Sequence, residues 1–224
     1  MTNDTIERHP SARALVAIVD ALQPGDYAAI DADGTLWNGD VGDETMRCGA
    51  KNADLWPQKI DADGYFRDHV HDHRRASALS AWAAGLVGGD VLQRAMTEQL
   101  DGKIAARRYL VDALIDAVAR GVNVVVVSAS PVEALPVALA MFGLQGAETI
   151  AAQPMSDNTM PAVDSLPVGQ GKVTRWRESA RPIPKLAIGD SRWDVPLLNF
   201  AEHGVLVTPF DDDPDTARSA ATLR

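Results

Sequence analysis

The chain has 224 residues, of which 46% are hydrophobic and 23% are charged, and its formal net charge is −10 at pH 7. These values are typical of a globular protein, and a chain of this length can fold without disulfides or a structural metal. The acidic excess disfavours sequence-independent binding to nucleic acid, which needs clustered lysine and arginine. We therefore expect no nucleic-acid partner. Because no apolar run approaches the length of a transmembrane helix, we expect no membrane partner either.

The cellular compartment is indicated by the start of the sequence and by its cysteine content. The first ten residues carry charged side chains and lack the basic start and apolar stretch of a secretory signal. Cys48 is the single cysteine, so no disulfide can form within the chain. A protein without disulfides fits a reducing compartment. We therefore expect a cytoplasmic protein, and the sequence leaves its oligomeric state open.

Short apolar segments alternate with longer segments of helical spacing along most of the chain. Strands that alternate with helices are typical of βαβ units and of a parallel sheet covered on both faces. The predicted fold class is therefore α/β, with a doubly wound, Rossmann-like parallel sheet. In chain order, the sequence predicts a helix over 11–22, a strand over 27–30, a helix over 103–120, a strand over 122–127, a helix over 132–142 and strands over 186–188 and 205–207.

The region between the first predicted strand and the helix at residue 103 has a different character. Residues 37–101 show few strand signals and contain three of the five tryptophans. We interpret this region as an inserted, mainly helical domain. The flanking segments, residues 1–36 and 102–224, would then form one domain together. The acidic run at 211–215 is interpreted as a solvated loop.

Three histidines within the inserted region raise the question of a metal site. They are His69, His71 and His73. If this stretch is helical, only His69 and His73 share a face. We interpret the three as part of a solvated surface.

Polar side chains follow three of the predicted strands, and ligands bind at the carboxyl ends of parallel strands. If those strands are neighbours, these side chains converge. Carboxylates so close together repel one another unless a cation lies among them, and oxygen ligands without His or Cys favour Mg²⁺ over zinc. A carboxylate nucleophile, a second carboxylate, a cation, a hydroxyl and a lysine suit phosphoryl transfer through an aspartyl-phosphate. The residues concerned are Asp31, Asp33, Thr35, Ser128, Lys172, Asp190 and Asp194.

The order of these residues resembles the four sequence motifs of the haloacid dehalogenase (HAD) superfamily. Each motif is weak alone, but all four in order, three of them at strand ends, are specific. The inserted region lies between the first and second motifs, which is the position of the helical cap in the phosphoserine-phosphatase-like and dehalogenase-like branches. The sequence Ser128-Ala129-Ser130 and the Gly-Asp-Ser motif look most like the phosphoserine-phosphatase-like branch. The motifs span residues 31 to 194 and read Asp31-x-Asp33-Gly34-Thr35, Ser128, Lys172 and Gly189-Asp190-Ser191-x-x-Asp194.

The resemblance implies a role for each carboxylate. Asp31 would attack the phosphate, and Asp33 would protonate the leaving oxygen and then activate the hydrolytic water. Mg²⁺ would be held by Asp31, Asp190 and the backbone carbonyl of Asp33. Asp194 would anchor Lys172 or a metal-bound water.

The same resemblance implies how the phosphate is bound. Ser128 and the amide of Ala129 would hold phosphate oxygens, and Lys172 would neutralise charge on the nucleophile and the phosphate. Thr35 would support this site. Because Trp37 comes just after the nucleophile loop, we expect it to line the substrate pocket.

The predicted function is that of a Mg²⁺-dependent phosphatase acting on a small phosphorylated metabolite. An acidic residue two positions after the nucleophile, here Asp33, favours phosphoryl transfer over dehalogenation. Gly34 and Ser191 differ from phosphoserine phosphatase itself, so the resemblance does not extend to serine phosphate as the substrate. A phosphomutase or phosphotransferase of the same superfamily stays open, as does a regulatory module that binds phosphate without turnover.

Overall fold

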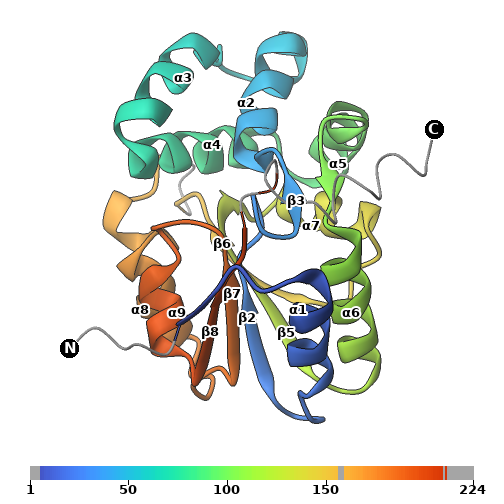
Figure 1. Cartoon of the computed structure of the whole chain (residues 1–224). Coiled ribbons are helices and arrows are strands. Elements are labelled where there is room, and N and C mark those ends of the chain that lie inside the picture. Colours follow the sequence, from blue (N-terminus) through green and yellow to red (C-terminus); the bar gives the residue numbers. More distant parts are fainter. Residues whose placement is uncertain (1–5, 156–158, 209, 211–224) are drawn as a thin grey trace.

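The centre of the molecule is a parallel β-sheet (Figure 1). The computed structural model describes residues 6–155, 159–208 and 210, and within them this sheet has six strands. Their order across the sheet is β1–β8–β7–β2–β5–β6. The bounds are β1 (Ile6–Arg8), β2 (Tyr27–Ile30), β5 (Asn123–Pro131), β6 (Glu148–Ala152), β7 (Leu186–Gly189) and β8 (His203–Leu206).

Helices cover both faces of this sheet, and the alternation of side chains along β2 shows why. Ala28 and Ile30 belong to one buried cluster, on the face covered by α1, α6 and α7, whereas Ala29 belongs to a second cluster with Trp176 of α8 and Leu197 of α9. Successive residues of a strand point to opposite faces, so β2 is apolar on both. These helices are α1 (Ala12–Asp20), α6 (Arg108–Ala119), α7 (Leu135–Met141), α8 (Gln170–Glu178) and α9 (Val195–Phe200).

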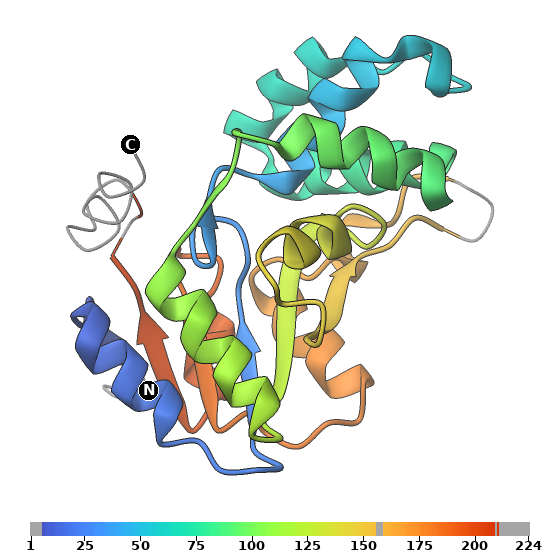
Figure 2. The same ribbon diagram turned by 90° about the vertical axis from the view of Figure 1, so that its right-hand side faces the viewer.

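The inserted region is helical and lies over the carboxyl ends of the strands (Figure 2). The chain enters it through β3 (Trp37–Asn38) and leaves it through β4 (Ala105–Ala106), and these two strands pair in antiparallel fashion. We call the helices between them the cap helices. They are α2 (Val41–Lys51), α3 (Ala62–His71), α4 (His73–Val87) and α5 (Gly89–Leu100), and a short 3₁₀ helix, η1 (Ala53–Leu55), follows α2. A second 3₁₀ helix, η2 (Val163–Ser165), precedes α8.

The predicted fold class is confirmed, and the differences are shifted element ends and elements that were not predicted, among them the helices α8 and α9. The helix predicted over 103–120 begins only at Arg108, because residues 105–106 pair with β3. The edge strands β1 and β6 were not predicted. Strand β1 is only three residues long, two of them charged, so it lacks an apolar pattern. The solvated loop predicted at 211–215 lies outside the described residues.

Two further expectations concern membranes and domains. Among the described residues, no helix is long and apolar enough to cross a membrane. The division into a domain of residues 1–36 with 102–224 and a second domain of 37–101 stays a prediction.

The packing of β8 against α9 generates a stability prediction. A Cβ added at Gly204 would lie 2.4 Å from the carbonyl oxygen of Leu198, which is backbone and cannot move aside. We expect Gly204→Ala to lower the free energy of unfolding by about 1–3 kcal/mol, the usual cost of overpacking. Chemical denaturation measures this. Gly146→Ala is the control, because its nearest neighbour is a side-chain methyl of Val118; equal stability of Gly204→Ala and the parent would contradict the packing described.

Candidate active site

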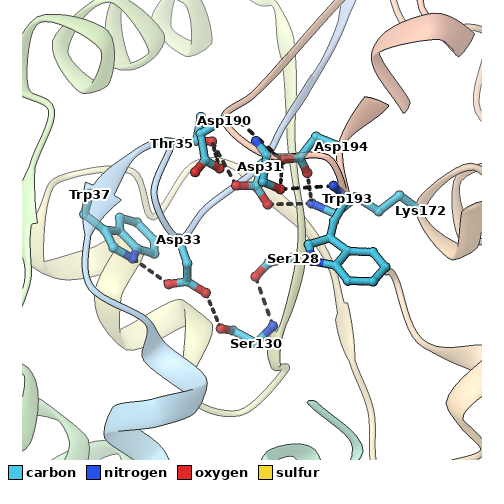
Figure 3. A network of polar contacts seen from close by, with 11 residues as sticks. Asp31, Asp33, Thr35, Trp37, Ser128, Ser130, Lys172, Asp190, Trp193 and Asp194 are labelled. Carbon is cyan, nitrogen blue, oxygen red and sulfur yellow. Dashed lines mark hydrogen bonds and ion pairs between the residues drawn. The ribbon is translucent and has the colours of Figure 1, made fainter. Parts of the chain in front are cut away.

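The predicted site residues converge at the carboxyl ends of the three central strands (Figure 3). Strand β2 lies between β5 and β7, and Ile30 is in register with Val126 and Ile188. The residues after β2 and β7 and those at the end of β5 therefore face one another. They line a cavity of about 170 Å³ whose opposite wall comes from the cap helices. Asp31, Asp33, Ser128, Ala129, Lys172, Asp190 and Asp194 all border this cavity.

A buried lysine joins two of the carboxylates. The Nζ atom of Lys172 lies 2.5 Å from Oδ1 of Asp31 and 2.6 Å from Oδ1 of Asp194, and all three residues are buried. Burial raises the pKa of Asp31 well above its usual value, the charge of Asp194 adds to the rise, and Lys172 opposes it. Burial alone would lower the pKa of Lys172, but the two carboxylates raise it, so the lysine stays protonated.

Asp194 uses both oxygens within the protein. Its Oδ2 accepts hydrogen bonds from the backbone N–H of Ser191 at 3.0 Å, from the hydroxyl of Ser191 at 2.8 Å and from the N–H of Asp190 at 3.3 Å. Its Oδ1 accepts from Lys172. Of the two roles that the resemblance left open for Asp194, this geometry favours the anchoring of Lys172.

Thr35 and Gly34 bring Asp190 close to Asp31. The Thr35 hydroxyl lies 2.8 Å from Oδ2 of Asp31 and 3.2 Å from Oδ1 of Asp190. Gly34 has φ +82°, and a Cβ there would come within 2.4 Å of Oδ2 of Asp190. Both the backbone conformation and the lack of space therefore require glycine at this position.

The carboxylates fit a divalent cation. Asp31, Asp190 and Asp194 each offer one oxygen within 4.8 Å of the others. Burial raises the pKa of Asp190, and the charge of Asp194 raises it further. A cation among these oxygens would offset the repulsion, and an all-oxygen donor set suits a hard cation. Because Asp194 is committed to Lys172 and Ser191, the side chains best able to ligate are those of Asp31 and Asp190.

Asp33 points away from this cluster, toward the base of the cap. Its Oδ1 accepts hydrogen bonds from the indole N–H of Trp37 at 2.8 Å and from the N–H of Val41 at 3.0 Å, and its Oδ2 accepts from the hydroxyl of Ser130 at 2.5 Å. Burial raises the pKa of Asp33, and these hydrogen bonds oppose part of the rise. The side chain is thus fixed at the cavity with a raised pKa.

Trp37 has a different place from the one predicted. It is fully buried and packs against Phe142, with ring centroids 5.7 Å apart. The described residues that line the cavity do not include Trp37. It orients Asp33 instead, because its indole N–H reaches that carboxylate.

The end of β5 supplies the serines of the site. Ser128 is buried, and its hydroxyl accepts a hydrogen bond from the N–H of Ser130 at 3.0 Å. Sequence reasoning gave Ser130 no role, although its hydroxyl binds Asp33. The sequence Ser-Ala-Ser at the end of this strand could have indicated that Ser130 also belongs to the site.

The cap side of the cavity is polar, and its residues were not predicted from the sequence. Strand-end reasoning does not apply to a helical region, so these residues were missed. The cap residues that line the cavity are Asp40, Gly42, Tyr65, His73, Ser77 and Ser80.

Two of the cap histidines form a stack that reaches the core. His73 stacks on Trp193, with centroids 5.6 Å apart, and on His69 at 5.0 Å. The Nδ1 atom of His69 lies 2.7 Å from Oδ1 of Asp43. The interpretation as a solvated surface is therefore wrong for His69 and His73 and holds for the exposed His71. The two rings stack, but they belong to the successive helices α3 and α4, so the expectation that they share a face of one helix is wrong.

Most of the chain, including this site, matches a known protein family. The model of the haloacid dehalogenase-like hydrolase family matches residues 28–199. The chain belongs to this family. The match covers all four motifs, so the predicted membership of the HAD superfamily is confirmed. No curated protein sequence matches it.

Solved structures share the fold at low sequence identity. A protein of unknown function from Bordetella pertussis Tohama I is 16% identical, with a TM-score of 0.64 over 98% of this chain and 96% of that one. A HAD family hydrolase from Salmonella enterica serovar Typhi is 18% identical, with a TM-score of 0.54 over 88% and 72%. A phospho-aspartyl intermediate analogue of phosphoserine phosphatase is 12% identical, with a TM-score of 0.50 over 90% and 99%.

Asp40 gives this HAD hydrolase a testable pH dependence. It caps α2 by accepting the N–H of Asp43 at 2.9 Å, and burial, with the charges of Asp33 and Asp43, raises its pKa to about 8. Between its unfolded pKa, about 4, and this value, the folded state holds a proton that the unfolded state releases. This contribution to stability is therefore complete below about pH 4 and is lost as the pH rises through 8.

Asp40→Asn removes this titration and keeps a capping oxygen. We expect the unfolding free energy of the variant, relative to the parent, to increase from about pH 5 to about pH 9. Urea denaturation at both pH values measures the difference. A difference that is constant with pH, or that falls, would contradict the raised pKa of Asp40.

Proposed function

We propose that this protein is a Mg²⁺-dependent phosphatase that hydrolyses a small phosphomonoester through an aspartyl-phosphate on Asp31. The observation that carries the proposal is the pairing of two differently held carboxylates at one cavity. Asp31 is bound by Lys172 and Thr35, whereas Asp33, two residues later, is bound by Ser130 and Trp37. Two environments of this kind suit two chemical roles.

The first half of the reaction uses Asp31 as nucleophile and Asp33 as acid. A carboxylate oxygen of Asp31 bonds to phosphorus while the bond from phosphorus to the leaving oxygen breaks. Asp33 donates its proton to that oxygen, so the alcohol leaves neutral. The raised pKa of Asp33, which burial causes, favours the protonated form that this step needs.

The second half restores the enzyme. Asp33, now ionised, accepts a proton from a water molecule that attacks phosphorus. The bond from phosphorus to Asp31 breaks, phosphate is released, and Asp33 is protonated again. Its hydrogen bonds from Ser130 and from the N–H of Val41 hold the carboxylate in place during both transfers.

Binding of the phosphoryl group and of the metal ion falls to different residues. The hydroxyl of Ser128 and the N–H of Ala129 would bind phosphoryl oxygens, and Lys172 would balance their charge. Asp31, Asp190 and the backbone carbonyl of Asp33 would hold Mg²⁺, which supplies neutralisation of charge on the transferring group.

The cavity supports a small substrate with a polar leaving group. Its volume is about 170 Å³, and its cap side carries hydroxyl, carboxyl and imidazole groups. A solved structure that shares the fold is that of a phospho-aspartyl intermediate analogue of phosphoserine phosphatase. Asp33 and the helices over the site favour turnover over a regulatory module, which needs neither an acid nor a cover.

Steady-state kinetics on a panel of phosphomonoesters with Mg²⁺ tests this function. We expect hydrolysis of at least one small polar member. Asp31→Asn should abolish turnover because the nucleophile is lost, and Asp33→Asn should lower kcat by about 10²–10⁴-fold because the acid is lost.

The chain contains a matched control, because the tetrapeptide Asp-Ala-Asp-Gly occurs again at residues 61–64. Asp63 occupies the position of Asp33 in this second copy but is exposed, so Asp63→Asn should keep the parent's activity. Hydrolysis of no member of the panel, or full activity of Asp31→Asn, would refute the proposed function.

A further inference from the structure

Arg107 is fully buried beside the loop that carries the nucleophile. It lies between β4, where the chain leaves the cap, and α6. Neither the motifs nor the proposed reaction gives it a role. A buried guanidinium is costly unless its N–H groups are bound, so the groups that it binds indicate what it does.

Arg107 binds three consecutive carbonyl groups of the nucleophile loop. Its backbone N–H donates to the oxygen of Leu36 at 2.8 Å. Its Nε donates to the oxygen of Thr35 at 2.9 Å, and its Nη2 donates to that of Gly34 at 3.2 Å. The same Nη2 also donates to the oxygen of Thr208 at 3.0 Å, just after β8. One residue thus fixes the backbone of the loop from residue 34 to 36.

That backbone determines where the carboxylates lie. The hydroxyl of Thr35 bridges Asp31 and Asp190, and Gly34 lies directly against Asp190. A shift of the carbonyls at 34 and 35 would therefore move the hydroxyl and change the spacing of both carboxylates. Displacements of about 1 Å can lower a rate by about 10²-fold.

The same loop continues into the cap. Trp37 of β3 is in register with Ala106 of β4, next to Arg107. The two strands that connect the cap to the sheet are therefore tied to the nucleophile loop by the side chain and backbone of one arginine. An apolar side chain at this position would leave the carbonyl oxygens of Thr35 and Gly34 without these donors.

We infer that Arg107 is a positioning residue, which fixes the nucleophile loop and ties it to β3 and β4, the strands that connect the cap helices to the sheet. The inference rests on the proposed function. Arginine suits this role because its planar fork donates several hydrogen bonds in fixed directions, whereas the lysine ammonium is a compact group on a flexible stem. Arg107→Lys keeps the charge and removes the fork.

The neighbouring residue provides a matched control. Arg108 is the first residue of α6 and is about half exposed, and its Nη2 lies 2.6 Å from Asp112 on the same helix. An exposed pair of this kind contributes little. Arg108→Lys therefore changes the same residue type, one position along, without touching the loop.

Hydrogen exchange and kinetics on the full chain test the inference together. For Arg107→Lys, we compare the rate of amide exchange with that of the parent in two peptides, one over residues 31–38 and one in β5. We expect the acceleration in residues 31–38 to be about tenfold larger than the acceleration in β5, because about 1.4 kcal/mol of local stability is lost. With p-nitrophenyl phosphate and Mg²⁺, kcat should fall by about ten- to hundredfold while KM stays within about threefold. Arg108→Lys should match the parent in both measurements.

Two results would overturn the inference. One is equal acceleration of exchange in residues 31–38 and in β5, which would indicate a general loss of stability. The other is an unchanged kcat despite faster exchange in the loop. If Arg107→Lys does not fold, Arg107→Gln, which keeps an N–H donor without a charge, is measured in the same way and judged by the same results. A parent that hydrolyses no phosphomonoester would refute the proposed function, and the exchange comparison would still decide whether Arg107 fixes the loop.

Discussion

The buried contact of Lys172 with Asp31 and Asp194 is the interaction on which the rest of the site depends. One positive charge lies between two carboxylates, with Asp190 beside them, so this buried cluster carries excess negative charge. Breaking such a contact would leave a buried charge without a partner, which is strongly destabilising. The remaining excess raises the pKa of Asp31 and Asp190, and it makes the cluster a good site for a divalent cation.

The fold creates this cluster through close approaches of backbone and side chain. A Cβ at Gly189 would lie 2.4 Å from the Cβ of Asp194, and one at Gly34 would strike Asp190. A Cβ at Gly171, next to Lys172, would lie 1.9 Å from the carbonyl oxygen of Leu166. These three glycines therefore mark the places where the chain packs too tightly for any side chain. They allow helix α8 and the β7 loop to deliver lysine and carboxylates to the end of β2.

The fold class and the centre of the site could be predicted from the sequence for one physical reason. Parallel strands end at the same edge of a sheet, so polar residues that follow central strands must meet there. Asp31, Ser128 and Asp190 followed this rule. Lys172 lies in a helix, so strand-end reasoning does not place it, and its specific role came from the resemblance to a family.

The cap side of the site could not be predicted in the same way. The cavity contact of His73 and its stack on Trp193 depend on how α4 packs over the sheet, which periodicity does not specify. Trp37 was expected in the pocket because of its place in the sequence, but β3 turns it into the core, where it binds Asp33. Arg107 was missed because its contacts with the nucleophile loop are to backbone carbonyls, which leave no pattern in a sequence.

The central claim is that Asp31 carries the phosphoryl group during turnover. The most direct measurement uses Asp33→Asn, in which hydrolysis of the intermediate is slowed, mixed with Mg²⁺ and a substrate from the panel and then quenched in acid. Peptide mass spectrometry locates any covalent phosphoryl group. The account predicts that group on Asp31, and its absence in Asp31→Asn. A phosphoryl group on another residue, such as His73, or turnover without any covalent intermediate, would contradict it.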